Sequence, residues 1–327
     1  MASSFTRIVS NLGLLLYYWL ESIVLAFIPK RLRYKDITGE VVLITGGGSG
    51  IGRLLATRFA SHGAKIVVWD LNLDAAEETV KIIKENGGEA YAYQCDVSKP
   101  QLVYDAAAKV KREVGRVNIL VNNAGIVTGK RLLDCPDHMI QKTFEVNAIS
   151  HFWTCKAFLP DMMADNHGHI VSIASMAGLS GVVRLTDYCA SKFAAVGFEE
   201  SLRLELYCEG YTGIHSTVVC PYYINTGMFE GAKPGVFTMM SPEYVADEIV
   251  SAVLVNQEVL LLPKAFNILI TIKTLFPVQV VREAMMSLNL STSMGHFGGH
   301  AAKSGTNQKH IEDHINNNKD KIKIKGL

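Results

Sequence analysis

The chain has 327 residues, a formal net charge of +1, 49% hydrophobic residues and 19% charged residues. This charge balance gives no bulk electrostatic case for nucleic acid, so we expect no nucleic-acid partner. The apolar fraction is ample for a large core and somewhat rich for a soluble protein. Six scattered cysteines without a C-x-x-C pair indicate reduced thiols in a cytosol-facing domain and not a disulfide framework.

An apolar stretch at residues 8–28 is long enough to span a bilayer, which takes about 20 residues. Aromatic residues at 17–19 are typical of a membrane interface, whereas Glu21 is costly inside a lone spanning helix. A basic cluster at 30–35 follows and predicts that the downstream domain faces the cytosol. We interpret residues 1–35 as a membrane anchor with a basic flank, either spanning or lying in one leaflet. The alternatives are a buried core helix and a cleaved signal peptide, for which no convincing cleavage site is present.

Patterns typical of strands and helices alternate through residues 36–263. Apolar runs typical of buried strands occur at 41–44, 65–69, 90–94, 117–121, 169–173, 215–219 and 259–262. Helix-compatible stretches lie near 51–59, 74–85, 101–114, 137–146, 150–165 and 188–209. No internal repeat is evident. This alternation predicts an α/β fold, a single Rossmann-type doubly wound parallel sheet with helices on both faces.

The first of these strands runs directly into the glycine-rich turn TGGGSGIG. A strand, a glycine turn and a helix N-terminus form a phosphate site, because free backbone N–H groups and the helix dipole favour an anion. Glycines there permit positive φ and close approach of a pyrophosphate to the backbone. The spacing is G-x3-G-x-G and not G-x-G-x-x-G, and taken alone it also fits a structural turn. The candidate phosphate-binding residues are Gly46, Ser49, Gly50, Ile51 and Gly52.

Polar and small residues end the next strands, at the sheet edge where ligands bind in open α/β proteins. Asp70 ends the second strand, where a carboxylate accepts hydrogen bonds from ribose hydroxyls and repels a 2′-phosphate. It therefore favours NAD over NADP, although alone it also fits a solvated turn aspartate. Asp96 ends the third strand similarly, with Val97 beside it to pack on an adenine. Small residues at the end of the fourth strand permit close approach of a cofactor, namely Asn123, Ala124 and Gly125.

Tyr188 and Lys192 lie four residues apart in a predicted helix and therefore on one face of it. A lysine ammonium beside a phenol lowers the phenol pKa from about 10 towards neutrality, which makes a general base for an alcohol proton. Ser175 closes the fifth strand, and its hydroxyl can hold the reacting oxygen. Asn147 can fix a water that links Lys192 to solvent, or it can be a helix-kink or capping residue. A Y-x-x-x-K pair alone is a weak signal.

In combination, TGGGSGIG, NNAG, Ser175, YCASK and the later Pro221 and Thr226 stand in the order and spacing of the short-chain dehydrogenases/reductases. The chain resembles that family over about residues 36–290. Longer motifs, such as HFWTCKAFLP and VCPYYINTGMFEG, narrow the resemblance to its membrane-bound retinol and 17-beta-hydroxysteroid dehydrogenases.

The resemblance implies roles for individual residues. A serine, a tyrosine, a lysine and an asparagine form the catalytic tetrad of that family, which corresponds to Asn147, Ser175, Tyr188 and Lys192. Residues implied to contact the nicotinamide cofactor, besides those above, are Tyr188, Lys192, Pro221 and Thr226. The resemblance also implies a homodimer.

The segment after residue 221 is apolar and is expected to form a lid over the substrate, with ordinary loop packing as the alternative. The candidate substrate contacts are Ser175, Tyr188, Tyr222, Met228 and Phe229.

Two further segments complete the chain. An apolar stretch at 264–290, interrupted by Lys273 and Pro277, is predicted to be a core helix or a membrane-seated lid. Residues 291–327 are polar, and we predict a disordered tail that buries little surface. Histidine pairs at 296/300 and 310/314 lack cysteine partners and a helix pattern, so no metal is expected.

We therefore expect NAD-dependent oxidation of a lipophilic alcohol at the endoplasmic reticulum membrane or on a lipid droplet, with all-trans-retinol as the best single substrate. A 17-beta-hydroxysteroid or another lipid alcohol is the alternative substrate. An alternative of another class is a lipid-droplet surface protein with little turnover, against which the intact tetrad counts.

Overall fold

The computed structural model of the chain describes residues 4–290 together with Ser293, Met294 and Phe297. Its centre is a seven-stranded parallel sheet with the strand order β3-β2-β1-β4-β5-β6-β7. The strands are β1 (Val41–Thr45), β2 (Lys65–Asp70), β3 (Ala90–Gln94), β4 (Ile119–Asn122), β5 (Gly168–Ile173), β6 (Ile214–Pro221) and β7 (Val259–Leu262). The predicted Rossmann-type doubly wound sheet is confirmed, and every strand expected from the sequence is present.

The order of the strands determines where a ligand can bind. β1 pairs with β2 on one side and with β4 on the other, so the chain reverses its winding direction between β1 and β4. In open α/β sheets, ligands bind at such a switch point, beyond the carboxyl ends of the strands. All five residues of β1 are buried, because a parallel sheet is covered on both faces.

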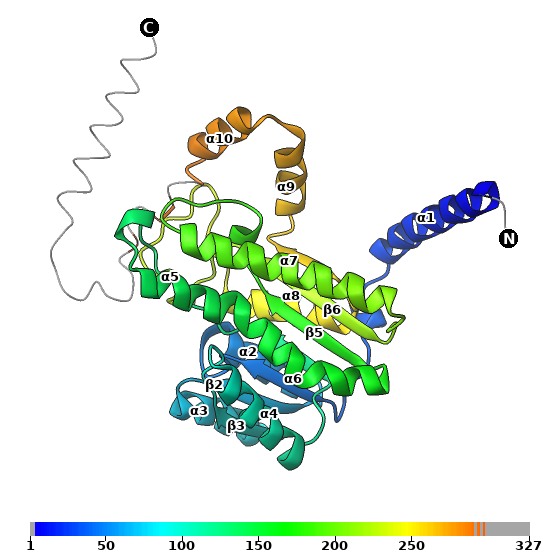
Figure 1. Ribbon diagram of the computed structural model, residues 1–327, viewed down its shortest axis with the longest axis vertical. Coiled ribbons are helices and arrows are strands. Elements are labelled where there is room, and N and C mark those ends of the chain that lie inside the picture. Colours follow the sequence, from blue (N-terminus) through cyan, green and yellow to red (C-terminus); the bar gives the residue numbers. More distant parts are fainter. Residues whose placement is uncertain (1–3, 291–292, 295–296, 298–327) are drawn as a thin grey trace, which may run out of the picture.

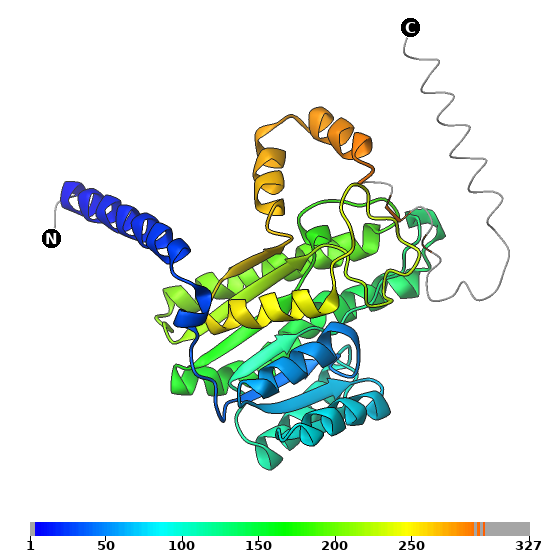
Figure 2. The same cartoon turned by 180° about the vertical axis from the view of Figure 1, so that it is seen from behind.

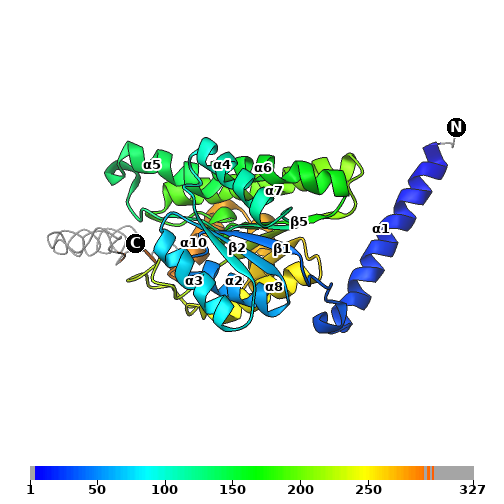
Figure 3. The same cartoon turned by 90° about the horizontal axis from the view of Figure 1, so that it is seen from below.

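Helices cover both faces of the sheet (Figure 3). One face is covered by α2 (Gly50–Ser61), α3 (Leu73–Glu85) and α8 (Pro242–Leu254). The other face is covered by α4 (Pro100–Glu113), α6 (Ser150–Asp165) and α7 (Thr186–Cys208), with α5 (Asp137–Phe144) at its end. The helix α8 was not among the expected elements. Short helical turns are η1 (Lys30–Arg33), η2 (Leu132–Asp134), η3 (Glu145–Ile149) and η4 (Met176–Gly178).

The N-terminal helix α1 (Ser4–Phe27) projects away from the sheet (Figures 1 and 2). Its segment Ser10–Phe27 is long and apolar enough to cross a membrane, and none of that segment is buried. The alternative of a buried core helix is therefore wrong. The linker that follows is attached to the base of the sheet, because the Lys35 N–H donates to Leu254 O and the Lys35 ammonium lies 3.1 Å from His169 Nδ1.

The apolar stretch at 264–290 forms two helices, α9 (Phe266–Leu275) and α10 (Val278–Ser287), which stand above the carboxyl end of the sheet (Figure 1). Only Phe266 is buried in α9, and no residue is buried in α10. The core-helix alternative for this stretch is therefore wrong as well.

Most of residues 291–327, including the histidine pairs, lie outside the described residues. The three that are described differ from the expectation that this segment buries little surface. Ser293, Met294 and Phe297 are all buried, because Met294 and Phe297 pack in one apolar cluster with residues of the loops that follow β4 and β6.

Candidate active site

The glycine turn between β1 and α2 leaves room for an anion. Gly46 and Gly50 have φ of +63° and +52°, values that L side chains rarely adopt. A Cβ at Gly52 would lie 2.1 Å from Gly46 O, so only glycine fits where α2 packs under the turn. Ser49 caps α2 without a side-chain hydrogen bond, so the N–H groups of the first turn remain directed towards a ligand.

Thr45 supports this turn from below and was not recognised in the sequence. Its Oγ1 accepts hydrogen bonds from the backbone N–H groups of Asn123 (3.0 Å) and Ala124 (3.1 Å). The Asn123 side chain in turn donates to Thr45 O (2.9 Å) and Gly46 O (3.1 Å). These bonds tie the ends of β1 and β4 together at the switch point. The only available sequence signal was a threonine directly before the glycine cluster.

Asp70 lies at the carboxyl end of β2, against the glycine turn. Its Oδ2 accepts from the Gly48 N–H at 2.9 Å, and a Cβ at Gly48 would lie 2.8 Å from that oxygen. The nearby Arg53 guanidinium donates to Gly48 O and pairs with Glu78 at 2.7 Å. Asp70 therefore borders the site as a carboxylate, while the neighbouring arginine is held by other partners.

Asp96 lies in a small polar cluster at the end of β3. It accepts from Ser98 N at 3.0 Å, from Ser98 Oγ at 2.6 Å and from the Lys142 ammonium at 3.2 Å. Burial acts to raise the pKa of Asp96, but these hydrogen bonds outweigh it and hold the pKa below its ordinary value. Lys142, which lies in α5, also was not recognised in the sequence.

One cavity of about 620 Å³, here called the glycine-turn cavity, gathers these groups. Every cofactor-contact candidate lines it: Gly46, Ser49, Gly50, Ile51, Gly52, Asp70, Asp96, Val97, Asn123, Ala124, Gly125, Tyr188, Lys192, Pro221 and Thr226. These residues come from the carboxyl ends of several strands, so the fold alone brings them together. The volume is within the range of small-molecule sites.

Tyr188 and Lys192 lie in the first turns of α7, and both are buried. The Lys192 ammonium donates to Ile173 O at 2.7 Å and lies 5.7 Å from the centre of the Tyr188 ring. It also borders Gly125, where a Cβ would be 3.7 Å from Lys192 Nζ and 3.5 Å from Asn147 Oδ1. The lysine thus faces both the phenol and the loop after β4.

Protonation of this pair differs from the expectation. Burial raises the pKa of Tyr188 and outweighs the opposing hydrogen bond with Ser175. Burial also lowers the pKa of Lys192 to about 8. The expected lowering of the tyrosine pKa is therefore not found, because both groups lose water and the lysine hydrogen-bonds to a carbonyl and lies over the ring.

Ser175 follows β5 and lies at the N-cap of η4. Its Oγ accepts from the Ala177 N–H at 3.1 Å and lies 3.4 Å from Pro221 O. Together with Tyr188 it borders both cavities of the site. A hydroxyl in this position can reach an oxygen placed beside the phenol.

Asn147 lies in η3, a π-helical turn between α5 and α6, and is fully buried. Its amide donates to Ile126 O (2.9 Å) and Ser191 Oγ (3.1 Å), and its Oδ1 accepts from Ile126 N (2.8 Å). These bonds hold the loop after β4 against α7. π-Turns inside helices occur frequently at functional sites, and both the kink and the functional interpretation of Asn147 fit this position.

Asp187, the residue before Tyr188, was not recognised in the sequence. It is buried, and its Oδ2 accepts from Thr128 Oγ1 and from Thr143 Oγ1 at 3.2 Å. Thr128 belongs to the loop after β4 and Thr143 to α5. The carboxylate therefore ties two neighbouring elements to the turn of α7 that carries Tyr188.

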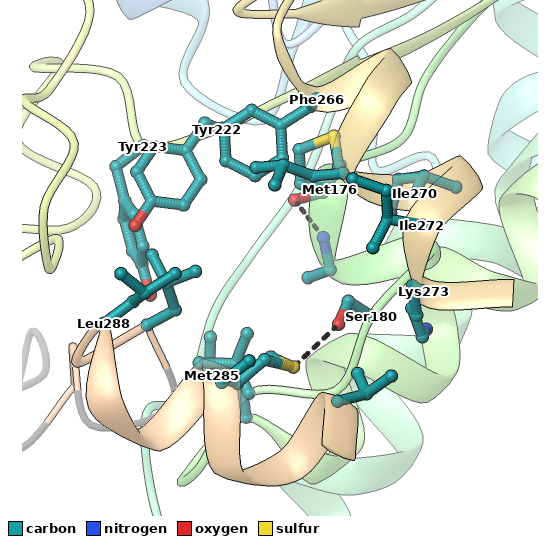
Figure 4. A pocket seen from close by; sticks show the side chains of 18 of the residues that line it. Met176, Ser180, Tyr222, Tyr223, Phe266, Ile270, Ile272, Lys273, Met285 and Leu288 are labelled. Carbon is teal, nitrogen blue, oxygen red and sulfur yellow. Dashed lines mark hydrogen bonds between the residues drawn. The ribbon is translucent and has the colours of Figure 1, made fainter. Parts of the chain in front are cut away.

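A second cavity of about 320 Å³, here called the apolar cavity, opens from Ser175 and Tyr188 and extends under α9 and α10 (Figure 4). Tyr222 and Phe229 line it as expected, whereas Met228 lines only the glycine-turn cavity. Its far walls come from the two C-terminal helices, which were not expected to carry substrate contacts: Phe266, Leu269, Ile270, Ile272, Lys273, Phe276, Val280, Val281, Ala284 and Met285. Among its described lining residues, Lys273 alone carries a charge.

This geometry is accompanied by a match to a family model. Residues 40–235 match the model described as short chain dehydrogenase. The chain belongs to the short-chain dehydrogenases. It is therefore an oxidoreductase, and the two cavities that meet at Ser175 and Tyr188 are its candidate active site.

Several curated short-chain dehydrogenases are similar along most of the chain. Short-chain dehydrogenase/reductase family 16C member 6 of Bos taurus is 49% identical over 290 residues, covering 88% of this chain and 91% of the relative. Epidermal retinol dehydrogenase 2 of Homo sapiens is 49% identical over 272 residues, covering 82% and 87%. Estradiol 17-beta-dehydrogenase 11 of Mus musculus is 43% identical over 279 residues, covering 85% and 93%.

Solved structures share the dehydrogenase fold. A short chain dehydrogenase/reductase from Burkholderia phymatum in complex with NAD is 27% identical, with a TM-score of 0.68, covering 73% of this chain and 94% of that one. A metagenomic short-chain oxidoreductase in complex with NADP is also 27% identical, with a TM-score of 0.60, covering 70% and 97%.

Proposed function

We propose that this dehydrogenase oxidises a lipophilic alcohol with NAD, and that all-trans-retinol is its substrate. The observation that carries the proposal is the meeting of the two cavities at Ser175 and Tyr188. One cavity has the shape and hydrogen-bonding groups for a dinucleotide, and the other is lined almost entirely by apolar side chains. An alcohol carbon at their junction would be next to both the phenol and the cofactor.

The residues of the glycine-turn cavity fit a nicotinamide dinucleotide. Gly46, Gly50 and Gly52 bring backbone N–H groups to a position where side chains would block the approach. When bound, the cofactor supplies the hydride acceptor for the alcohol carbon. Lys192 would hold the ribose beside it, and Asn123, Ala124 and Gly125 would form the floor.

The choice of NAD over NADP rests on the charges of this cavity. Asp70 presents a carboxylate at the end of β2, where it would repel a 2′-phosphate. Among the described lining residues, the basic side chains are Lys142, which pairs with Asp96, and Lys192. Arg53 is paired with Glu78, so it would have to leave that partner to neutralise a phosphate.

The chain's own residues account for the proton transfer. Ser175 would hold the alcohol oxygen by a hydrogen bond, while the Tyr188 phenolate takes the proton. Asn147 would hold a water that connects Lys192 with solvent. Because burial raises the pKa of Tyr188, this step is favoured at alkaline pH.

The apolar cavity supports a lipid alcohol but leaves two substrate classes, retinoids and 17-beta-hydroxysteroids. Each class occurs in the name of one similar relative: epidermal retinol dehydrogenase 2 for retinoids and estradiol 17-beta-dehydrogenase 11 for steroids. We favour retinol, because the sequence motifs resemble the retinol dehydrogenases most. A lipid-droplet surface protein with little turnover is a weaker alternative, because Ser175, Tyr188 and Lys192 line one cavity and Asn147 bonds to the loop after β4 beside it.

We further propose that the enzyme is a homodimer bound to the endoplasmic reticulum membrane or to lipid droplets, with its catalytic domain in the cytosol. Residues 1–35 would be the anchor, residues 36–263 the catalytic domain, and residues 264–290 a roof in contact with lipid. The support is the exposed apolar surface of α1 and of the two C-terminal helices. Such a roof would let the alcohol pass from lipid into the apolar cavity.

The test compares two substrates and two cofactors in one preparation. Membranes that contain the expressed chain are incubated with NAD or NADP and with all-trans-retinol or estradiol, and formation of the reduced cofactor is followed. Retinal formation with a higher kcat/KM for NAD is the expected result. Membranes with the Tyr188→Phe chain are the control. Faster turnover of estradiol would show that a steroid and not retinol is the preferred substrate. No turnover of either substrate would favour the lipid-droplet surface protein without catalysis.

A further inference from the structure

Three buried residues beyond α10 contact the loop between β6 and α8. We call Ser293, Met294 and Phe297 the tail anchor. All three lie outside the family match, which ends at residue 235, and outside the α9–α10 roof. The loop that they contact, residues 222–241, carries Phe229, one of only four described residues that line both cavities. The tail anchor is therefore placed to influence the junction where the alcohol reacts.

Polar contacts attach the tail anchor to this loop at two points. The Lys233 N–H donates to Ser293 O at 2.8 Å, and Ser293 Oγ lies 2.8 Å from the Tyr223 hydroxyl. Ser293 is only 1% exposed, so water does not compete for either bond. The same loop also approaches the end of α10, outside the tail anchor, because a Cβ at Gly235 would lie 2.5 Å from Leu288 O.

Aromatic packing extends the contact to the catalytic tyrosine. The Phe297 ring lies 6.4 Å from the Phe229 ring, which packs edge-on against the Tyr188 ring at 5.9 Å and the Tyr223 ring at 5.0 Å. Met294 is fully buried in the same cluster. Displacing Phe297 would therefore remove one of the aromatic neighbours that pack on the Phe229 ring.

The Phe297 ring packs directly against Gly129. A Cβ at Gly129 would lie 2.0 Å from Phe297 Cδ1, which is far inside van der Waals contact. The ring can therefore occupy this position only over a glycine. The loop after β4, which carries Gly129, and the loop after β6 are thus held together by one side chain of the tail.

The junction that Phe229 borders has Ser175, Tyr188 and Tyr222 as its other walls. The reacting carbon must lie there, within reach of Ser175 and Tyr188. A fixed aromatic wall beside this carbon leaves space for the two hydrogens of a primary alcohol more readily than for a second carbon substituent. One methyl group against a rigid apolar wall changes kcat/KM by roughly tenfold or more.

We propose that the tail anchor positions Phe229 and Tyr223 and thereby determines specificity for primary over secondary lipophilic alcohols. This inference rests on the proposed oxidation of a lipid alcohol and narrows its substrate class. Phe297 acts through Phe229, so it is a positioning residue and makes no contact with the reacting atoms.

The test uses 1-decanol and 2-decanol, which differ only in the position of the hydroxyl group. The full chain should prefer 1-decanol by roughly tenfold or more in kcat/KM. In Phe297→Ala this preference should fall at least about fivefold, mainly because 2-decanol is oxidised faster. The reason is that the Phe229 ring can then move, so the extra methyl group of 2-decanol lowers kcat/KM less. Phe297→Leu, which keeps an apolar side chain over Gly129, should restore most of it. An unchanged preference in Phe297→Ala would overturn the proposal.

A double-mutant cycle separates the contact from backbone strain. Gly129→Ala alone should reduce the preference as Phe297→Ala does, because the new Cβ displaces the ring. Gly129 has φ of +69°, so the substitution also strains the backbone. In the Phe297→Ala background that strain remains, but the preference should not fall further. Additive losses of preference would contradict packing of Phe297 against Gly129 as the cause.

Hydrogen exchange provides a readout that needs no substrate. A chain ending after residue 290 should show faster amide exchange in the peptide 226–240, which contains the Lys233 amide bonded to Ser293. A chain ending after residue 297 is the matched control and should exchange as the full chain does. Unchanged exchange after the shorter truncation would refute the contact. If the full chain oxidises neither decanol nor retinol while exchange changes as expected, the proposed function fails and the contact remains.

Discussion

Burial, and not charge pairing, dominates the pKa values of the candidate catalytic residues Tyr188 and Lys192. Tyr188 and Lys192 were recognised because a four-residue spacing places them on one helix face. The structure adds that both are removed from water, which raises the pKa of the phenol and lowers that of the ammonium to about 8. Both shifts favour the neutral form of each group, so the ion pair of phenolate and ammonium is the costly state.

The pH dependence of turnover follows from this state. In the proposed mechanism alcohol oxidation needs the deprotonated Tyr188, and its pKa lies above the ordinary value, so the reactive fraction grows as pH rises. We expect kcat/KM for alcohol oxidation to rise between pH 7 and pH 9 and kcat/KM for carbonyl reduction to change little, because the phenol that donates the proton stays protonated over this range. Steady-state rates in both directions provide the measurement. A flat profile for oxidation in this range would contradict the role of the buried phenol.

The Tyr188→Phe variant is the matched control for that profile. Loss of a general base costs about 10²–10⁴ in rate, and the remaining rate should lose its dependence on pH. NAD binding, followed by cofactor fluorescence, should change little, because the glycine turn and Asp70 are untouched. A variant that keeps more than about a tenth of the wild-type kcat would show that Tyr188 is not the base.

At the scale of elements, α9 and α10 form the roof of the apolar cavity and present apolar side chains outward. Leu275, Phe276 and Val278 are 75%, 51% and 79% exposed, at the corner where the two helices meet. The inner faces of the same helices line the cavity. An exposed apolar corner above an apolar cavity is the arrangement expected for a roof whose corner rests in lipid, while the exposed Arg282 and Glu283 of α10 would stay in water.

Residue 275 should therefore enter an apolar environment on membranes. In the Cys208→Ser background, which removes the exposed cysteine among the described residues, we would place a cysteine at Leu275 and attach an environment-sensitive dye. Liposomes should shift its emission to the blue. Leu133, which is 96% exposed on η2, is the matched control and should show no shift. Equal responses at both positions would rule out contact of the roof with lipid.

For the whole molecule, α1 and the roof are two separate apolar surfaces attached to one domain (Figure 1). The linker between α1 and β1 is tied to the base of the sheet by Lys35, and Lys30 donates to Gln257 at 2.8 Å. The roof is attached at the opposite, carboxyl end of the strands through β7. A chain with both surfaces can attach to a membrane at two places.

Removing residues 1–35 should therefore release the protein from membranes only in part. Flotation with liposomes measures the bound fraction, and NADH formation in detergent checks that the domain is intact. The full chain is the reference for both measurements. Complete release of an active protein would show that the roof makes no contact with lipid and that the anchor alone holds the enzyme.

The sequence alone determined the parallel sheet and most residues of the candidate site, whereas the strand order came from the structure. The reason is physical: a parallel strand buried on both faces needs an uninterrupted apolar run, and a pyrophosphate site needs glycines at fixed positions. These requirements are local, so the apolar run at 41–44 and the glycine turn were visible without any tertiary information. The spacing of Tyr188 and Lys192 was local in the same sense.

The tertiary structure decided what depends on distant contacts. The roles of Thr45, Lys142 and Asp187 became visible only when separate strands and helices met, because their partners lie far away in the sequence. The protonation of Tyr188 depends on burial by the whole fold. The burial of Phe297 depends on the missing side chain of Gly129, which lies far away in the sequence, so composition indicated a disordered tail where three residues are packed against the active-site loops.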